Sequence, residues 1–190
     1  MRQALRFGCV ALPALVATNA FAADPPLFAA FKKFCADTKA EPDAVKAAAL
    51  AASSKNVASA ATDKKAPAAA AGSSWTLLFQ GHHLTVTSGT LNTPAAANIP
   101  ATKGVTCAIT DSDGDNAGAS AIGAWAKVPA TAEVGGVFGT YSYQEKNGVR
   151  VGVKAPDKAV KDPEGMWNLT LSQVGKLTAV NLAHVKPASP

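Results

Sequence analysis

The chain of 190 residues contains very little arginine, and this scarcity argues against a class of partners. Its three arginines are Arg2, Arg6 and Arg150, and the first two lie in the amino-terminal leader described below. Without these two the formal net charge of +5 falls to +3 (5 minus 2), and Arg150 is the last arginine left. Recognition of phosphates and nucleobases relies on arginine forks and clustered basic side chains. Because the lysines are scattered, we expect a solvated surface and no nucleic-acid partner.

Long apolar runs are also missing, apart from one at the amino terminus. Residues 1–22 combine two arginines, an apolar run over 7–16 and a small-x-small pattern at 20–22, which together predict a signal peptide. The run is shorter than the roughly 20 apolar residues that a membrane span needs. Cys9 precedes most of the run, and Arg6 stands where a lipid-attachment motif requires an aliphatic residue. We therefore expect an exported protein, periplasmic or secreted, with no stable membrane insertion.

Cysteine is scarce as well, and removal of the signal leaves only Cys35 and Cys107. An even pair in an exported chain predicts a disulfide, with two free buried thiols as the alternative. Cys35 falls on the apolar stripe of an amphipathic segment that also carries Phe28 and Phe31. Cys107 alternates with apolar residues over 105–109, so it faces the core from a predicted strand. A bridge would fasten the front helix to the sheet, and chain-entropy arguments give it roughly 4 kcal/mol.

The composition divides the remaining chain into four regions. Residues 23–52 predict a helical pair, since Pro42 and flanking acids open a second amphipathic helix. Residues 53–72 contain alanine, serine and lysine with almost nothing large to bury, which predicts a tether. Residues 73–186 predict an antiparallel sheet with an inserted helix, and 187–190 a short tail.

Apolar and polar residues alternate from Trp75 onward, and this period predicts three hairpins. We draw the first with a two-residue turn at Gly81-His82. The others are drawn with three-residue turns over 146–148 and 173–175, because these registers gather the apolar side chains on one face. A two-residue turn at 147–148 would put an aromatic residue on the face of Arg150. The expected cross-strand pairs are Phe79–Leu84, Leu77–Val86, Tyr143–Val151, Tyr141–Val153, Leu171–Leu177 and Leu169–Ala179.

Together these elements predict an α+β fold. An amino-terminal helical pair packs on a mostly antiparallel sheet of six to seven strands, and one helix is inserted after the third strand. The inserted helix turns Ile122 and Trp125 inward and ends near Pro129. The aromatic residues of the sheet region are assigned to the core rather than to a groove: Trp75, Trp125, Tyr141, Tyr143 and Trp167.

Several short motifs are spread along the mature chain. They are a helix with Phe-x-x-x-Cys-x-x-Thr, a tryptophan that begins a strand, and a second cysteine before a helix that contains tryptophan. The matching residues are Phe31, Cys35, Thr38, Trp75, Cys107 and Trp125. This pattern resembles a loosely defined group of small exported bacterial proteins of unknown function. The resemblance implies a fold arrangement and an exported location, and no activity comes with it.

The stretch DSDGDN, residues 111–116, is the best candidate for a binding site. Asp111, Asp113 and Asp115 alternate as at the start of a calcium-binding loop. The match fails at the sixth and twelfth positions, where that loop needs glycine and glutamate and this chain has asparagine and isoleucine. We therefore regard the three aspartates as a weak cation candidate and expect Asp113 or Asp115 to cap the following helix.

The sequence lacks the usual catalytic motifs. It contains no Gly-x-Ser-x-Gly elbow and no Ser-x-x-Lys pair, and without a C-x-x-C spacing a redox dithiol is not expected. His82 and His83 are adjacent and would face opposite sides of a strand, and we place His82 in the turn. His184 is remote in sequence, so the histidines predict no metal site. We name no catalytic residue and expect no cofactor.

These observations favour an exported protein without catalysis that binds a protein or envelope component. One alternative is an exported hydrolase with a spatially assembled site. That hydrolase would require a cleft in which a serine or aspartate contacts His83 or His184. A second alternative is a weak calcium-binding module built on residues 111–116.

Overall fold

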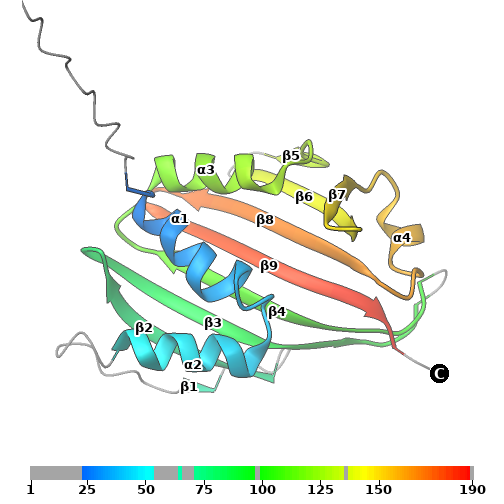
Figure 1. The fold of residues 1–190 in the computed structure, drawn as a ribbon, viewed down its shortest axis with the longest axis horizontal. Helices are drawn as coiled ribbons and strands as arrows, with labels where there is room; N and C mark the ends of the chain where they lie inside the picture. The colour runs from blue at the N-terminus through cyan, green and yellow to red at the C-terminus, as the bar shows by residue number, and fades with distance from the viewer. Residues whose placement is uncertain (1–22, 54–63, 66–70, 97–98, 135–136, 189–190) are drawn as a thin grey trace, which may run out of the picture.

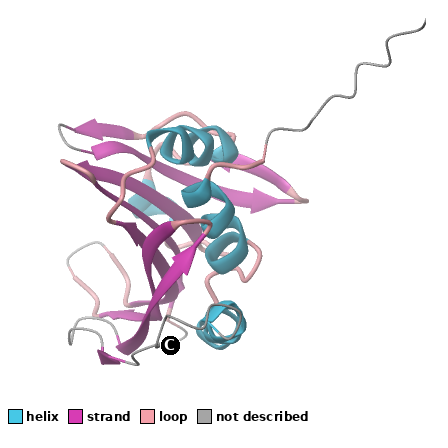
Figure 2. Ribbon diagram, turned by 90° about the vertical axis from the view of Figure 1, so that its left-hand side faces the viewer, coloured by secondary structure: helices cyan, strands magenta, loops and turns pink. Residues whose placement is uncertain are grey.

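The computed structural model describes residues 23–53, 64–65, 71–96, 99–134 and 137–188. Within them the chain forms one antiparallel sheet with three helices across one of its faces (Figure 1, Figure 2). The helical elements are α1 (Pro26–Phe31), the π-helix η1 (Lys32–Ala36), α2 (Pro42–Ser53), α3 (Asn116–Ala126) and α4 (Pro156–Ala159). The strands are β1 (Lys64–Lys65), β2 (Ala71–Phe79), β3 (His82–Thr93), β4 (Thr102–Asp111), β5 (Ala132–Val134), β6 (Val137–Lys146), β7 (Val149–Gly152), β8 (Met166–Val174) and β9 (Leu177–Pro187).

The order of strands in the sheet is β1-β2-β3-β4-β9-β8-β6-β5, and β7 pairs with β6. Seven of these nine strands have four or more residues, and all described pairs are antiparallel. Helix α3 follows β4, the third of the longer strands. The predicted α+β fold, with six to seven strands and one inserted helix, is therefore confirmed.

The predicted signal peptide, residues 1–22, and most of the predicted tether lie outside the described residues. Within 53–72, Ser53 ends α2, Lys64–Lys65 form β1, and β2 begins at Ala71. At the other end, β9 reaches Pro187, the first residue of the predicted tail. None of the helices in the described part of the chain is long and apolar enough to cross a membrane.

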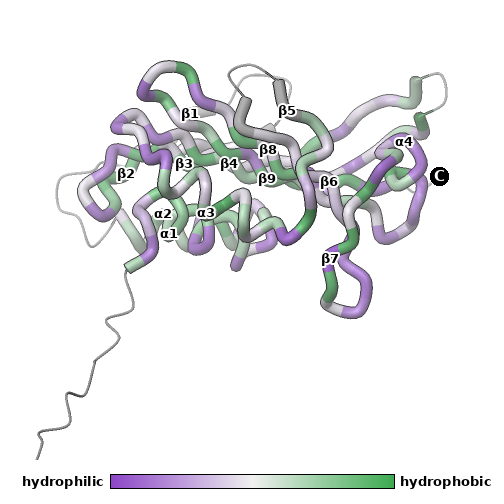
Figure 3. The backbone as a smooth tube through the Cα atoms, turned by 90° about the horizontal axis from the view of Figure 1, so that it is seen from above, coloured by the Kyte–Doolittle hydropathy of each residue, from purple (hydrophilic) through white to green (hydrophobic). Residues whose placement is uncertain are grey.

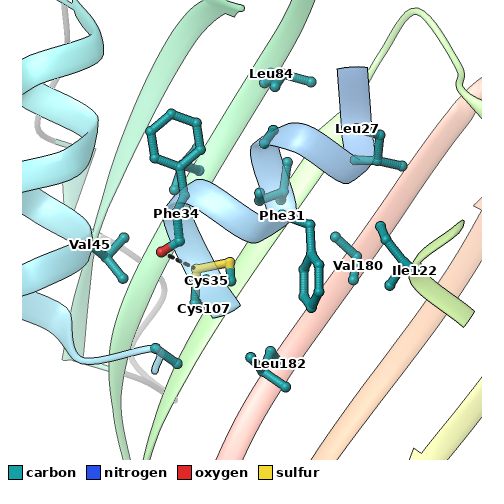
Figure 4. Packing of buried hydrophobic residues seen from close by; sticks show 14 of the residues in the cluster. Leu27, Phe31, Phe34, Cys35, Val45, Leu84, Cys107, Ile122, Val180 and Leu182 are labelled. Carbon is teal, nitrogen blue, oxygen red and sulfur yellow. Dashed lines mark hydrogen bonds between the residues drawn. A yellow bond between two sulfur atoms is a disulfide. The ribbon is translucent and has the colours of Figure 1, made fainter. Parts of the chain in front are cut away.

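The core lies between α1, η1, α2 and α3 and the covered face of the sheet (Figure 4). Phe31 meets Trp125 of α3 edge-on, with ring centroids 4.8 Å apart, and Phe34 meets Phe79 of β2 in the same way at 5.5 Å. Such edge-to-face aromatic pairs add specificity to the burial of apolar area. The amphipathic stripe of the front helix is thus divided between two neighbours, α3 and the sheet.

Cys35 and Cys107 form the predicted disulfide, with their Cα atoms 5.4 Å apart. Both side chains are fully buried, and the bond joins η1 to β4 beneath the helices (Figure 4). The two cysteines are 72 residues apart in sequence. The inward-facing pair inferred from the two hydrophobic periodicities is therefore confirmed.

The predicted registers of the first and last hairpins are wrong, because the first turn lies one residue earlier than expected and the last has two residues instead of three. Leu77 pairs with Leu84 across a Gln80-Gly81 turn, so His82 is the first residue of β3 rather than a turn residue. Gln80 and Gly81 both have positive φ, as two-residue hairpin turns whose twist matches that of the strands require. In the last hairpin Leu171 pairs with Val180, and two residues connect the strands.

The predicted three-residue turn between β6 and β7 is also wrong. Lys146 pairs with Val149, and Asn147 and Gly148 both have positive φ. Tyr143 therefore lies opposite Gly152, on the face that carries Arg150, and Val151 is 49% exposed. Figure 3 shows this hairpin extending from the body of the molecule, with hydrophobic and hydrophilic residues side by side. The turn geometry determines the register here, and an arginine replaces the expected apolar contact.

Candidate functional site

A row of stacked side chains crosses the covered face of the sheet beyond the helices. Arg150 of β7 lies with its guanidinium carbon 3.6 Å from the ring centroid of Trp125 and 4.9 Å from that of Tyr143. Tyr143 stacks on Trp167 of β8 at 6.4 Å, and Trp167 stacks on His184 of β9 at 4.3 Å. The pairs Tyr143–Trp167 and Trp167–His184 are direct cross-strand neighbours, so the backbone register places the rings face to face.

Arg150 is held from several directions. Its Nη1 donates to the carbonyl oxygen of Trp125 at 2.6 Å, and its Nε donates to Glu145 Oε1 at 3.3 Å. Burial raises the pKa of Tyr143 to about 12, although the charge of Arg150 acts in the opposite direction. The tyrosine therefore stays neutral at all physiological pH values. Arg150, the one arginine of the described residues, is thus engaged within the fold.

Replacing Arg150 with alanine is expected to lower the free energy of unfolding by about 1–2 kcal/mol, since it removes a partly desolvated cation–π contact and a hydrogen bond. Arg150→Lys should recover part of this loss, because an ammonium keeps the charge but loses the planar stacking. Urea unfolding of both variants measures the effect. Val151→Ala, on the exposed face of the same strand, is the matched control, and an equal loss there would contradict the prediction.

A cleft of about 410 Å³ opens at the end of this row. Trp167 and His184 line it together with charged groups from the η1–α2 connection, β6, the loop before β8 and the end of β9. Its lining residues are Lys39, Glu41, Glu145, Glu164, Gly165, Trp167, His184 and Lys186. A second hollow of about 490 Å³ shares Glu145 and Glu164 with it. Of the five aromatic residues assigned to the core, Trp167 is thus also part of a cleft wall.

Gly165 shapes the cleft because it adopts a positive φ of 72° next to β9. A Cβ atom at this position would collide with the carbonyl oxygen of Val185. Glycine therefore allows the start of β8 to lie directly against β9. This close approach also brings the carbonyl oxygen of Glu164 within 2.9 Å of His184 Nε2.

The imidazole of His184 is half-buried, and burial lowers its pKa from the ordinary value of 6.5. The nearby charge of Lys186 acts in the same direction, whereas the Glu164 carbonyl and the carboxylates of Glu41 and Glu145 raise the pKa. Because Nε2 faces a carbonyl oxygen, the neutral ring carries its proton on Nε2. His184 is therefore a neutral hydrogen-bond donor at neutral pH.

The lowered pKa of His184 makes stability depend on pH. Below about pH 6.5 the unfolded chain binds a proton that the folded chain does not, so stability falls until the lowered pKa is reached. His184→Gln should remove this fall, as measured by urea midpoints between about pH 7 and pH 5. Asp113 and Asp162 also have lowered pKa values. Their contribution to the free energy of unfolding is lost only at lower pH, below their ordinary pKa of 3.8. An unchanged pH profile in His184→Gln would contradict this assignment.

The three aspartates of the DSDGDN stretch have two different roles. Asp115 caps α3, since its Oδ1 accepts from the N–H of Gly118 at 2.7 Å, and its Oδ2 accepts from the N–H of Leu27 at 3.0 Å. Asp111 and Asp113 lie instead beside His82, which sequence reasoning treated as an incidental turn residue. The three aspartates of the weak cation candidate thus do not share one set of partners. The proximity of His82 to Asp111 and Asp113 follows from the pairing of β3 with β4, which the sequence does not show.

The contact that would favour a hydrolase is present only in part. His83 Nδ1 lies 3.1 Å from Asp113 Oδ2, at an exposed position. The neighbouring Ser112 donates its hydroxyl to the backbone carbonyl of His83 rather than to the ring. Among the described residues, therefore, an aspartate–histidine pair exists without a hydroxyl nucleophile on the imidazole. His184 contacts a backbone carbonyl and the ring of Trp167.

Comparison with protein-family models, with curated proteins and with solved structures finds no match to this chain. The resemblance to a group of small exported proteins therefore stays a prediction. What can be said of function depends on the geometry of the cleft and of the DSDGDN stretch.

Proposed function

We propose that this protein is exported and acts without catalysis, by binding a charged segment of a protein or envelope component in the cleft beside Trp167 and His184. The observation that carries the proposal is the composition of the cleft wall. Side chains of both signs surround a preformed aromatic stack there. A rigid stack flanked by charges can orient a partner without prior reorganisation, which lowers the entropic cost of binding.

The character of the cleft supports a polar partner rather than a small apolar ligand. Trp167 is covered on one face by Tyr143 and on the other by His184, so its ring edge is what remains for contact. Glu41, Glu164 and their neighbours offer carboxylates, and Lys39 and Lys186 offer ammonium groups. Charges of both signs in one cleft favour partner specificity and steering over raw affinity. Binding should therefore be reversible and weaken as salt is added.

The adjoining hollow supports an extended occupant. It shares Glu145 and Glu164 with the cleft, so the two hollows adjoin at the end of β6 and the loop before β8. The disulfide suits a protein that works outside the reducing cytosol. His184 supports binding rather than catalysis, because its Nε2 is committed to a backbone carbonyl.

Affinity capture from an envelope extract, followed by mass spectrometry, tests the proposal. The bait is the untagged mature chain, coupled to a support, and the comparison is the double variant Glu41→Gln/Glu164→Gln. The control is Asp43→Asn/Asp157→Asn, which removes the same charge from exposed positions outside both hollows. We expect wild type and control to recover the same partner, and the cleft variant to lose it. Equal recovery by all three baits, or no specific partner, would overturn the proposal.

A further inference from the structure

Ligand-type side chains gather where β3 begins and β4 ends. Leu84 lies opposite Asp111 in the β3–β4 ladder, which brings His82 next to the loop that follows β4. His82 Nδ1 is 2.9 Å from Asp111 Oδ2, and single ligand atoms of His82, Asp111 and Asp113 all lie within 4.8 Å of one another. A tetrahedral ion with ordinary bond lengths needs its ligand atoms about 3.3 Å apart. Small side-chain rotations would therefore bring the three groups onto one ion.

Hydrogen bonds from the backbone already hold both carboxylates in place. Asp111 Oδ1 accepts from the N–H of Asp113 at 2.9 Å, while its Oδ2 faces His82. Asp113 Oδ2 accepts from the N–H of His83 at 2.6 Å and lies 3.1 Å from the Nδ1 of the same histidine. Hydrogen bonds of this kind orient the ligands of metal sites and are needed for tight metal binding.

The three side chains of the cluster differ in their exposure to solvent. The Asp111 side chain is fully buried, that of His82 is 23% exposed, and that of Asp113 is 42% exposed. A buried carboxylate needs a compensating charge, and a divalent cation would neutralise Asp111 and Asp113 together. The exposed side leaves a path for an ion and for solvent ligands to enter.

A second, independent observation comes from β9. Thr178 is the direct cross-strand partner of Asp111, so its side chain stands beside the carboxylate on the same face of the sheet. Thr178 is fully buried, and its hydroxyl is the one buried side-chain group of the described residues without a hydrogen-bond partner. Buried hydroxyls are normally paired, and one beside a carboxylate suits an outer contact to a ligand oxygen or to an ion-bound water.

We propose that His82, Asp111 and Asp113 form a binding site for a divalent transition metal of the zinc type. One imidazole nitrogen and two carboxylate oxygens suit Zn²⁺, whereas Ca²⁺ takes six to eight oxygen ligands. Asp115, which a calcium loop would require, has both carboxylate oxygens on backbone N–H groups. Three protein ligands leave a fourth position for solvent. The ion would join the start of β3 to the end of β4 and the loop before α3.

Calorimetric titration of Zn²⁺ into the untagged, chelator-treated mature chain tests the site. We expect one ion per chain with micromolar affinity or better, a loss of about tenfold or more in His82→Ala and in Asp113→Asn, and no competition from equimolar Ca²⁺. Asp43→Asn removes an exposed carboxylate outside the cluster and should bind Zn²⁺ as wild type does. Asp113 is exposed, so its variant is expected to fold, and circular dichroism of each metal-free variant checks this.

Three outcomes would overturn the proposal: no Zn²⁺ binding by the wild-type chain, unchanged affinity in both ligand variants that fold, or displacement of Zn²⁺ by equimolar Ca²⁺. Replacement by Co²⁺ gives an additional readout, because visible absorption bands report the coordination of the ion. Wild type should give such bands and His82→Ala should not. If the bands persist in His82→Ala, the imidazole is not a ligand and the assigned donor set is wrong.

Discussion

Replacing Cys35 and Cys107 together with alanine is expected to lower the free energy of unfolding by about 4 kcal/mol. The bond closes a segment with a sequence separation of 72, and chain-entropy arguments assign roughly 4 kcal/mol to a loop of this size. Alanine is the suitable replacement because both sulfurs are fully buried, and a serine hydroxyl there would add an unsatisfied polar group. The melting temperature should fall by about 8–16 °C.

Urea unfolding of oxidised wild type, reduced wild type and the double variant measures this effect. The reduced protein should unfold close to the double variant, because both lack the same constraint on the unfolded chain. Thiol titration of oxidised, denatured wild type should find no free thiol from this pair. Two titratable thiols at Cys35 and Cys107, or a urea midpoint that a reductant leaves unchanged, would contradict the prediction.

The location of the bond explains how much of it could be predicted from the sequence. Each cysteine lies on an apolar face whose period is visible locally, 3.6 residues in the helix around Cys35 and two in the strand around Cys107. In a fold with one core, two inward faces can meet if the helix covers the strand, so the pairing could be predicted without knowledge of the strand order. The actual helix is a short α-helix continued by a π-helix, and this detail leaves no comparable mark in the sequence.

The hairpin registers show the limit of the same reasoning. The predicted registers maximised apolar contact on one face. The actual turns all have two residues, although three were expected in the second and third hairpins, and two of the turns have consecutive positive φ values. In the β6–β7 hairpin, the search for a single apolar face excluded Arg150 from the face of Tyr143. The guanidinium of Arg150 nevertheless lies on that face and stacks between Trp125 and Tyr143. Hydrophobic periodicity counts arginine as polar, so it cannot predict a guanidinium that packs against aromatic rings.

Neither candidate site could be assembled from the sequence, because both depend on strand pairing and register. Trp167 meets His184 through the β8–β9 register, and it meets Tyr143 only because β6 lies on the other side of β8. Likewise His82 reaches Asp111 through the pairing of β3 with β4. The sequence identified DSDGDN as the stretch of interest and predicted a helix cap within it. His82, which adds an imidazole nitrogen to the carboxylate oxygens of this stretch, lies 29 residues from Asp111 in the sequence.

Replacing Asp115 with alanine is expected to destabilise the fold by about 3 kcal/mol, a large effect for a single acidic residue. The side chain is nearly buried and satisfies two backbone donors at once, the N–H of Gly118 in α3 and the N–H of Leu27 in α1. Each buried donor left without a partner costs about 1–3 kcal/mol. Asp115→Asn keeps one acceptor oxygen and should therefore lose about half as much.

Asp43 provides the matched control, because it is an exposed acid in the first turn of α2, and its replacement with alanine should cost less than about 1 kcal/mol. Hydrogen exchange gives the sharper test, since Asp115→Ala should release the N–H of Leu27, 88 residues away in sequence. Asp115 holds the start of α1, and the disulfide holds η1 at its other end. Removal of both attachments should therefore cost more than the sum of the two separate losses. If the losses simply add, α1 is positioned by the packing of its apolar face alone.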